Sequence, residues 1–119
     1  MKKINLREKL NLFSEQWTPK IIGALNGQHV KLAKLEGEFV WHTHEEEDEL
    51  FYVIKGQLII ELVDEKITIN EGEMFIVPKG VEHKPIAHKE AHVLLFEPAV
   101  IKHTGNVKYE LTKENLEWI

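Results

Sequence analysis

The sequence predicts an all-β fold, a sandwich or barrel of short strands that follows a short N-terminal helix. Apolar runs rich in Val, Ile, Leu and Phe recur at intervals of roughly 8–12 residues, which is typical of such folds. Turn-forming residues separate the runs. The 119 residues can bury one core, and the hydrophobic fraction of 43% is that of a globular protein. We therefore expect a single domain over residues 1–119.

Residues 1–19 are expected to form a helical arm. Asn5 is followed three residues later by Glu8, the pattern of a helix start in which Asn5 caps the first turn and Glu8 reaches back to it. Apolar residues then recur at helical spacing, at Leu6, Leu10 and Phe13. Because the helix is brief, we expect it to lie on the main body.

Residues 20–100 are expected to form the barrel. Asn26-Gly27 is a strong hairpin turn, and further turns are expected at Gly56, at Asp64-Glu65 and at Gly72. The loop from Pro78 to Pro85 precedes the last barrel strand. The expected strands are, in chain order, KIIGAL, HVKLAKL, FVWHTH, ELFYVI, LIIELV, KITI, MFIVP and AHVLLFEP.

Residues 101–119 are expected to form a C-terminal extension. Gly105-Asn106 marks a turn within it, and VKYEL has the composition of a short strand. The final stretch, LTKENLEWI, fits either a terminal helical turn or a tail.

The run ELFYVI is apolar on both faces. Alternation places Leu50, Tyr52 and Ile54 on the face opposite to Glu49. A strand with two apolar faces needs a second layer outside the barrel, which either the N-terminal helix or another copy of the molecule would supply. We take this pattern as an indication of a homodimer.

Composition excludes several classes of function. The net charge of −5 and the lack of a basic patch argue against a nucleic-acid partner. The absence of cysteine excludes disulfides and thiolate sites, so a metal would have to be held by imidazole and carboxylate. No apolar run approaches the roughly 20 residues of a membrane span, and the N-terminus lacks the apolar core of a signal peptide. We expect a cytoplasmic protein.

The stretch from Trp41 to Gly56 combines the residue types of a metal site. His42 and His44 are two residues apart, so on a strand both imidazoles would point to the same face. Five acids follow, and the last of them, Glu49, begins the next apolar strand. A carboxylate on a buried face needs a partner, and a metal ion is one such partner. The other four acids are expected to face water, and the alternative for the whole stretch is a polar loop before a strand.

A further candidate, His83, follows a strand and the turn at Gly80. On its own, a histidine in a loop is more often a surface residue than a ligand. We expect His29 at the surface and both His88 and His103 in turns. His92 is either a surface residue or, by alternation in AHVLLFEP, one that faces into the barrel.

Together these stretches resemble the two motifs of the cupin superfamily. The first motif, G-x5-H-x-H-x3–4-E-x6-G, is matched with one residue fewer after the first glycine, by Gly37, His42, His44, Glu49 and Gly56. The second, G-x5-P-x-G-x2-H-x3-N, is matched except at its end, where Ala87 replaces asparagine, by Gly72, Pro78, Gly80 and His83. The resemblance covers residues 35–96 and is that of the small single-domain members.

This resemblance implies a double-stranded β-helix, a small jelly-roll barrel with a divalent metal ion near one mouth. Carried over residue by residue, the ligands would be His42, His44, Glu49 and His83. Three imidazoles and one carboxylate suit Fe, Mn, Ni, Cu or Zn better than Ca or Mg. Four protein ligands leave two positions of an octahedral ion for a chelating substrate, and the formal charge of about +1 favours anionic or enolisable oxygen ligands. Ala87 weakens the transfer of activities in which an asparagine arranges the substrate.

Two kinds of function fit this pattern. The first is a metalloenzyme that acts on a small oxygenated or anionic metabolite by isomerisation, as the likeness to the cupin domain of phosphomannose isomerases implies, or by oxygenation. The second is a sensor or storage domain that binds a sugar or organic acid without turnover. The sequence nominates no general base; Phe51 is the best candidate for a pocket wall because it shares the face of Glu49, whereas Tyr52 points the opposite way.

Overall fold

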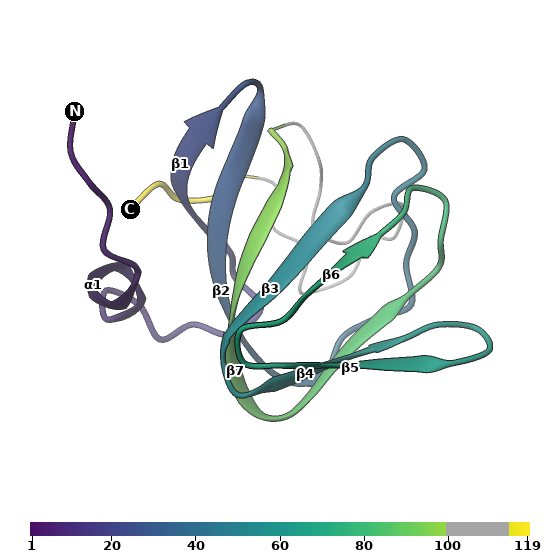
Figure 1. Cartoon of the computed structure of the whole chain (residues 1–119). Coiled ribbons are helices and arrows are strands. Elements are labelled where there is room, and N and C mark those ends of the chain that lie inside the picture. The colour runs from purple at the N-terminus through teal and green to yellow at the C-terminus, as the bar shows by residue number, and fades with distance from the viewer. Residues whose placement is uncertain (100–114) are drawn as a thin grey trace.

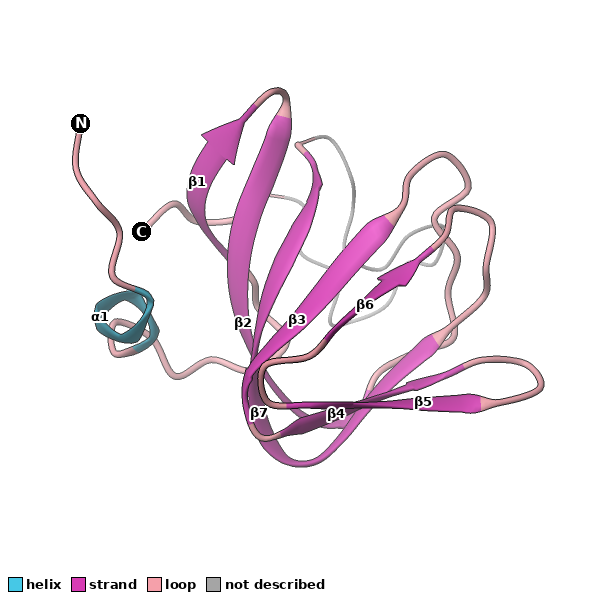
Figure 2. Ribbon diagram, viewed as in Figure 1, coloured by secondary structure: helices cyan, strands magenta, loops and turns pink. Residues whose placement is uncertain are grey.

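Seven strands and one short helix make up the regular structure of residues 1–99 and 115–119, the part of the chain that the computed structural model describes (Figure 1). The strands form a jelly-roll barrel, and the helix lies outside it (Figure 2). The elements are, in chain order, α1 (Leu6–Leu10), β1 (Lys20–Leu25), β2 (Gln28–Glu38), β3 (Glu49–Lys55), β4 (Gln57–Glu61), β5 (Lys66–Asn70), β6 (Met74–Val77) and β7 (Lys84–Pro98). The predicted all-β jelly roll with a short N-terminal helix is confirmed.

The longest strand, β7, connects the parts of the barrel because it pairs with three other strands. On one edge its first half pairs with β4, where Ile59 lies opposite Ile86, and its second half pairs with β3, where Leu50 lies opposite Phe96. Its other edge pairs with β2 over most of its length. The sheet order is β1-β2-β7-β3-β6, with β4 and β5 off this path.

The last strand begins earlier than the sequence predicted. We expected a loop as far as Pro85 and a strand from Ala91, but β7 starts at Lys84 and includes His88, which was expected in a turn. Proline lacks only the N–H donor, so its carbonyl can still join a strand ladder. The Pro85 carbonyl accepts a hydrogen bond from the backbone N–H of Phe39 at 3.0 Å. The strand therefore passes through the proline.

The strand predicted for FVWHTH does not form. β2 ends at Glu38, just after Gly37 with its φ of 90°, and the next residues lie outside any named strand. Within this stretch His42 forms an isolated antiparallel bridge with His83, and the Phe39 N–H donates to the Pro85 carbonyl. Three steps along the chain separate Phe39 from His42, but only two separate Pro85 from His83. The two facing segments therefore lack the one-to-one register that a strand ladder requires.

The N-terminal arm supplies part of the second layer that the apolar outer face of β3 requires. Asn5 caps α1 as predicted, since its side-chain oxygen accepts a hydrogen bond from the Glu8 N–H at 3.0 Å. The helix ends at Leu10, so Phe13 lies beyond it rather than within it. Both of these apolar side chains are nonetheless buried, in a cluster against which Ile54 of β3 packs.

The described end of the chain, residues 115–119, is a tail that runs beside β1. The Ile21 N–H donates to the carbonyl of Glu117 at 2.9 Å, and the Ile119 N–H donates to the carbonyl of Ile21 at 3.0 Å. These residues do not form the alternative helical turn. The predicted turn at 105–106, the predicted strand VKYEL and His103 lie outside the described residues. No helix in the described part of the chain has the length and apolar character needed to cross a membrane.

Glycines with positive φ sit at the predicted turns. Asn26 and Gly27, with φ of 49° and 76°, form the two-residue turn between β1 and β2. Gly56 has a φ of 87°, and a Cβ atom there would lie 3.2 Å from the carbonyl oxygen of Glu90. Gly72 has a similar φ of 82° but open space around it. The backbone of β7 thus passes close to Gly56 and not to Gly72.

These two glycines give a matched pair for a stability measurement. Gly72→Ala should lower the free energy of unfolding by about 1 kcal/mol, because only the positive φ penalises it. Gly56→Ala should lower it by a further 1–3 kcal/mol or so, because the added methyl must also displace the β7 backbone. Urea unfolding of both variants checks this. Equal losses for the two variants would show that β7 does not pass as close to Gly56 as described.

Candidate metal centre

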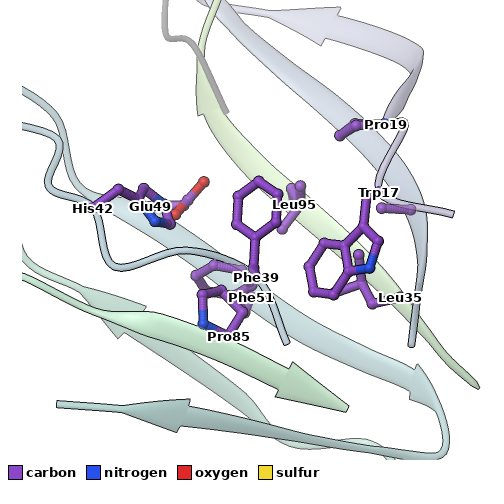
Figure 3. Close-up of a pocket in the computed structure, with 10 residues that line it drawn as sticks. Trp17, Pro19, Leu35, Phe39, His42, Glu49, Phe51, Pro85 and Leu95 are labelled. Carbon is purple, nitrogen blue, oxygen red and sulfur yellow. The ribbon is translucent and has the colours of Figure 1, made fainter. Parts of the chain in front are cut away.

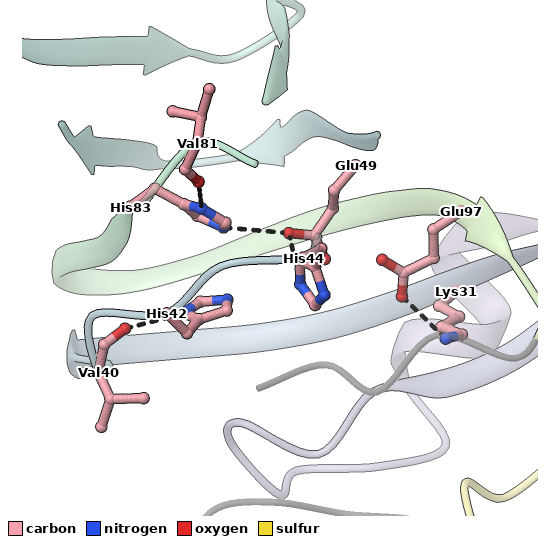
Figure 4. Close-up of polar contacts among 8 residues, drawn as sticks. All are labelled: Lys31, Val40, His42, His44, Glu49, Val81, His83 and Glu97. Atoms are coloured by element: carbon pink, nitrogen blue, oxygen red, sulfur yellow. Dashed lines mark hydrogen bonds and ion pairs between the residues drawn. The ribbon is translucent and has the colours of Figure 1, made fainter. Parts of the chain in front are cut away.

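Four buried side chains converge inside the barrel: His42, His44, Glu49 and His83. One ligand atom from each lies within 4.8 Å of the others. The first two histidines follow β2, Glu49 is the first residue of β3, and His83 immediately precedes β7. All four are at most 5% exposed. The structure therefore brings together the whole group that the sequence singled out (Figure 4).

The backbone joins the two segments that carry these side chains. His42 and His83 exchange two backbone N–H···O hydrogen bonds, each of 3.0 Å. The Gly80 N–H donates to the His44 carbonyl at 2.8 Å, and the Lys79 N–H donates to a carboxylate oxygen of Asp48 at 2.9 Å. Asp48 is exposed, as predicted, but it also ties the acidic loop to the turn before His83. This pairing takes the place of the strand that the sequence predicted around His42 and His44.

Hydrogen bonds to the backbone orient two of the imidazoles. His42 Nδ1 lies 2.8 Å from the Val40 carbonyl, and His83 Nδ1 lies 3.0 Å from the Val81 carbonyl. A carbonyl oxygen only accepts, so Nδ1 carries the proton in both rings. Nε2 is then left with its lone pair for the centre of the group, which is the arrangement usual in metal-binding histidines.

Two of the imidazoles face a carboxylate. Glu49 Oε1 lies 3.3 Å from His83 Nε2 and 3.5 Å from His44 Nε2. His44 Nε2 is buried and has no hydrogen-bond partner among the described residues. A buried carboxylate and buried nitrogen lone pairs at these distances need a cation among them, either a proton or a metal ion. The donor set of three imidazoles and one carboxylate fits a transition-metal site.

Burial sets the protonation states that suit such a site. Burial, together with the neighbouring His83, lowers the pKa of His42 to about 4. Burial also acts to raise the pKa of Glu49, but hydrogen bonds from the imidazoles of His44 and His83 outweigh it and hold this pKa well below the usual value. Such hydrogen bonds need a proton between the rings and the carboxylate, which is the place that a metal ion would take. At neutral pH His42 is therefore neutral and Glu49 is ionised, which are the forms that bind metals.

A buried ion pair lies next to the group. Lys31 Nζ donates to Glu97 Oε1 at 2.8 Å, and both side chains are at most 1% exposed. The β3–β7 register, with Leu50 opposite Phe96, makes Glu97 the neighbour of Glu49. Burial and the charge of Glu49 raise the pKa of Glu97 well above its usual value. The other oxygen, Glu97 Oε2, is buried on the side toward Glu49 and has no hydrogen-bond partner among the residues that the structure describes (Figure 4).

The sequence analysis missed this pair, although a pattern in the sequence points to it. Alternation in AHVLLFEP places Glu97 on the same face as Val93 and Leu95, so it is a charge on an apolar face, just as Glu49 is. Val93 and Leu95 are buried, as this alternation requires.

An apolar cavity borders the group on the side of the N-terminal arm (Figure 3). His42 and Glu49 are its polar lining, and Phe51 lines it as predicted. The remaining walls are apolar and come from the arm and the barrel: Trp17, Pro19, Ala33, Leu35, Phe39, Pro85 and Leu95. Trp17 and Phe39 stack with ring centroids 4.6 Å apart.

The other described histidines lie away from the group. His92 does not face into the barrel: its Nε2 lies 3.0 Å from Glu90 Oε1, on the face of β7 opposite to Val93. His88 is exposed, although it lies in β7 and not in a turn. His29 is half-buried rather than at the surface, and contacts the Trp118 ring edge to face.

Comparisons with known proteins agree with the motifs and the fold. The family model for the cupin domain, Cupin_2, matches residues 28–97. The protein YdbB of Bacillus subtilis is 31% identical over 104 residues, which are 78% of this chain and 92% of that one. The crystal structure of a cupin-2 domain protein from Shewanella frigidimarina is 47% identical with a TM-score of 0.79, and the match covers 80% of this chain and 93% of that one.

An enzyme is also among the relatives. A 3-hydroxyanthranilate 3,4-dioxygenase of Aspergillus fumigatus is 32% identical over 78 residues, which are 60% of this chain. The match spans only 40% of the length of that enzyme.

The low pKa of His42 predicts how the stability of the metal-free protein depends on pH. The unfolded chain takes up a proton on His42 near pH 6.5, whereas the native protein does so only near pH 4. The free energy of unfolding should therefore fall as the pH drops through this interval, by up to about 3 kcal/mol from this residue. Urea unfolding at several pH values checks this.

In the variant His42→Gln this contribution should vanish, so its stability should fall less steeply between pH 6.5 and pH 4. The exposed His88→Gln is the control and should retain the wild-type slope. A wild-type slope in His42→Gln would contradict a buried, neutral imidazole at this position.

Proposed function

We propose a metal-dependent function on the premise that this chain belongs to the cupin domain family. In this proposal the chain binds one divalent transition metal ion, which is Fe, Mn, Ni, Cu or Zn. The ligands of the ion are His42, His44, Glu49 and His83. The metal-bound protein acts on a small oxygenated or anionic metabolite. The observation that carries this proposal is the buried carboxylate of Glu49, which faces imidazole lone pairs and needs a cation among them.

The metal ion would supply Lewis acidity toward the oxygen atoms of a chelating ligand and, if it is redox-active, reactivity toward dioxygen. The protein would hold the neutral imidazoles and the ionised carboxylate in place through Val40, Val81 and the bridge between the two histidine segments. The similarity to a 3-hydroxyanthranilate dioxygenase supports oxygenation over isomerisation as the class of reaction. A sugar- or acid-binding domain without turnover is the alternative.

Glu97 is the residue that we nominate to accept a proton or a hydrogen bond from the substrate. Lys31 holds one oxygen of its carboxylate, and the other oxygen is buried and unpaired next to Glu49. A hydroxyl group of a chelating ligand would satisfy that oxygen. The raised pKa of Glu97 also suits a group that takes up and releases protons.

The homodimer and the cytoplasmic location stay predictions. For the dimer, the supporting observation is the outer face of β6, where Met74 and Ile76 are 59% and 46% exposed. These side chains lie beside Leu50 and Tyr52 of β3 in the register of the two strands. A second copy of the chain would cover this face.

Metal analysis tests the proposed ligands. Protein purified without chelator should contain about one divalent transition metal ion per chain, and His83→Ala should lower the affinity at least about 100-fold, because even changes beyond the ligands cost 10- to 100-fold. Elemental analysis gives the ion and its stoichiometry, and circular dichroism checks that the barrel is folded.

His88→Ala is the matched control, because this histidine is exposed on β7. This variant should keep the full metal content. A folded His83→Ala variant with unchanged metal content would refute the proposed site. Bound iron, together with consumption of dioxygen when a substrate is added, would favour the oxygenase. Binding of a sugar or organic acid without turnover would favour the non-catalytic binding domain.

Glu97→Gln tests the proposed proton acceptor. In the wild type Lys31 Nζ donates to the Glu97 carboxylate. In the variant it should donate to the amide oxygen of the glutamine, so the NH2 group should point toward the candidate metal centre. The variant thereby replaces an acceptor with a donor. Cobalt-loaded protein should bind glycolate, which has a hydroxyl group, about 10- to 100-fold more weakly, since a charge-assisted hydrogen bond is lost.

At neutral pH both carboxyl groups of oxalate are ionised and it has no hydroxyl group, so its binding should not weaken in Glu97→Gln. Glu61→Gln is the control, because Glu61 pairs with Lys66 on the exposed hairpin and should leave both ligands unaffected. An equal loss for glycolate and oxalate would show that Glu97 only supports the structure.

A further inference from the structure

The apolar cavity beside the candidate metal centre is nearly filled, and a residue of the N-terminal arm fills it. The free volume that remains is about 30 Å³. A single buried water needs about 10–15 Å³, whereas an apolar cavity that binds benzene has about 150 Å³. The space next to His42 and Glu49 therefore accommodates a group of methyl size and not an aromatic ring.

Trp17 is the largest side chain in the cavity wall that does not come from the barrel. Its indole stacks on Phe39 with an angle of 8° between the ring planes, and Phe39 in turn contacts the His42 ring edge to face at 5.5 Å between centroids. A row of rings thus leads from the arm to a candidate ligand (Figure 3). Removal of the indole would enlarge this cavity on the side of Phe39 that faces away from His42, and would leave Phe39 without the ring that it stacks on.

Several contacts hold Trp17 in this position. Its backbone N–H donates to the Lys34 carbonyl at 2.9 Å, and its indole Nε1–H donates to the Glu36 carbonyl at 2.9 Å. The preceding residue, Gln16, forms a bridge with Lys34, and its amide donates to Glu90 at 2.7 Å. Both ends of the tryptophan are therefore fixed to β2.

The backbone of Trp17 is strained. Its φ of 56° lies in the left-handed region, which glycine adopts readily and a bulky aromatic residue rarely does. Such strain persists only where the surroundings impose it, and it is concentrated at functional sites. The indole belongs to the main hydrophobic cluster of the barrel and is 8% exposed.

We propose that Trp17 determines the size of substrate that the candidate metal centre accepts. By filling the end of the cavity away from His42 and backing Phe39, which contacts His42, the indole limits the substrate to a small chelating acid or hydroxy acid whose apolar part is of methyl size. The limit is set by the arm, which lies outside the segment that matches the cupin domain model. This inference rests on the proposed function for the chelating ligand, but the cavity itself can be tested without metal.

The variant Trp17→Gly separates the indole from the backbone, because glycine relieves the positive φ while the ring is removed. In metal-free protein we expect toluene to bind to Trp17→Gly and to shift the methyl NMR signals of Leu35 and Leu95, which line the cavity. The wild-type protein should show no such shifts at the same toluene concentration. Trp118→Gly, which removes an exposed tryptophan far along the chain, should behave as the wild type.

In cobalt-loaded protein the same variant should change ligand preference. The wild type should bind glycolate and discriminate against mandelate, which carries a phenyl group. Trp17→Gly should improve mandelate binding relative to glycolate by about 10- to 100-fold, the gain expected from burial of a phenyl ring. Trp17→Phe keeps a ring in place and should retain most of the wild-type preference. If the glycine variant fails to fold, the wild type still tests the proposal, because binding of toluene or a preference for mandelate by the wild-type protein would overturn it.

The outcomes separate this inference from the proposed function. Unchanged preference in a folded, cobalt-loaded Trp17→Gly, or the absence of toluene shifts at Leu35 and Leu95, would overturn the role of Trp17. Failure of the wild type to bind cobalt would instead refute the proposed metal site, and the toluene experiment would still decide whether Trp17 fills the cavity.

Discussion

The rest of this structure depends on one electrostatic constraint: a buried carboxylate faces the ring nitrogens of buried imidazoles. Glu49 Oε1 lies 3.3 Å from His83 Nε2, and the Nδ1 atom of that ring already donates to a backbone carbonyl. Without a cation this contact would place negative charge against a lone pair in a medium of low dielectric constant. A proton or a dication resolves it, and because three imidazoles and one carboxylate converge here we regard the four-residue group as a binding site rather than as a polar cluster of the core.

The surroundings of the group distribute the remaining charge. Glu97 adds a second carboxylate, and Lys31 adds an ammonium 2.8 Å from it. With a dication bound, the formal net charge in the barrel interior is +1 when Glu97 is ionised and +2 when it is protonated, and either charge favours an anionic ligand. The apolar cavity on the other side is too small for an aromatic ring. The barrel therefore supplies charge on one side of the group and shape on the other.

The sequence predicted the architecture and the members of the group, because both leave local patterns. Asn26-Gly27 predicted the first hairpin, and Glu49 was recognised as a charge on an apolar face. The segment around His42 was wrongly predicted as a strand. Alternation of apolar and polar residues also fits this loop, whose backbone forms a β-bridge only where His42 faces His83. Glu97 could have been found by the same alternation as Glu49. Trp17 could not, because nothing in the sequence of the arm indicates which part of the barrel it covers.

Nitrogen NMR of the histidine rings tests the proposed centre most directly. We expect the metal-free protein to carry the ring proton on Nδ1 of His42 and His83, as their backbone hydrogen bonds require. One equivalent of Zn²⁺ should then shift the Nε2 signals of these two residues and of His44, and leave those of His88 and His92 unchanged. Zinc-dependent shifts at His88 or His92 alone, or no shift at all, would contradict a metal site built from the four converging side chains.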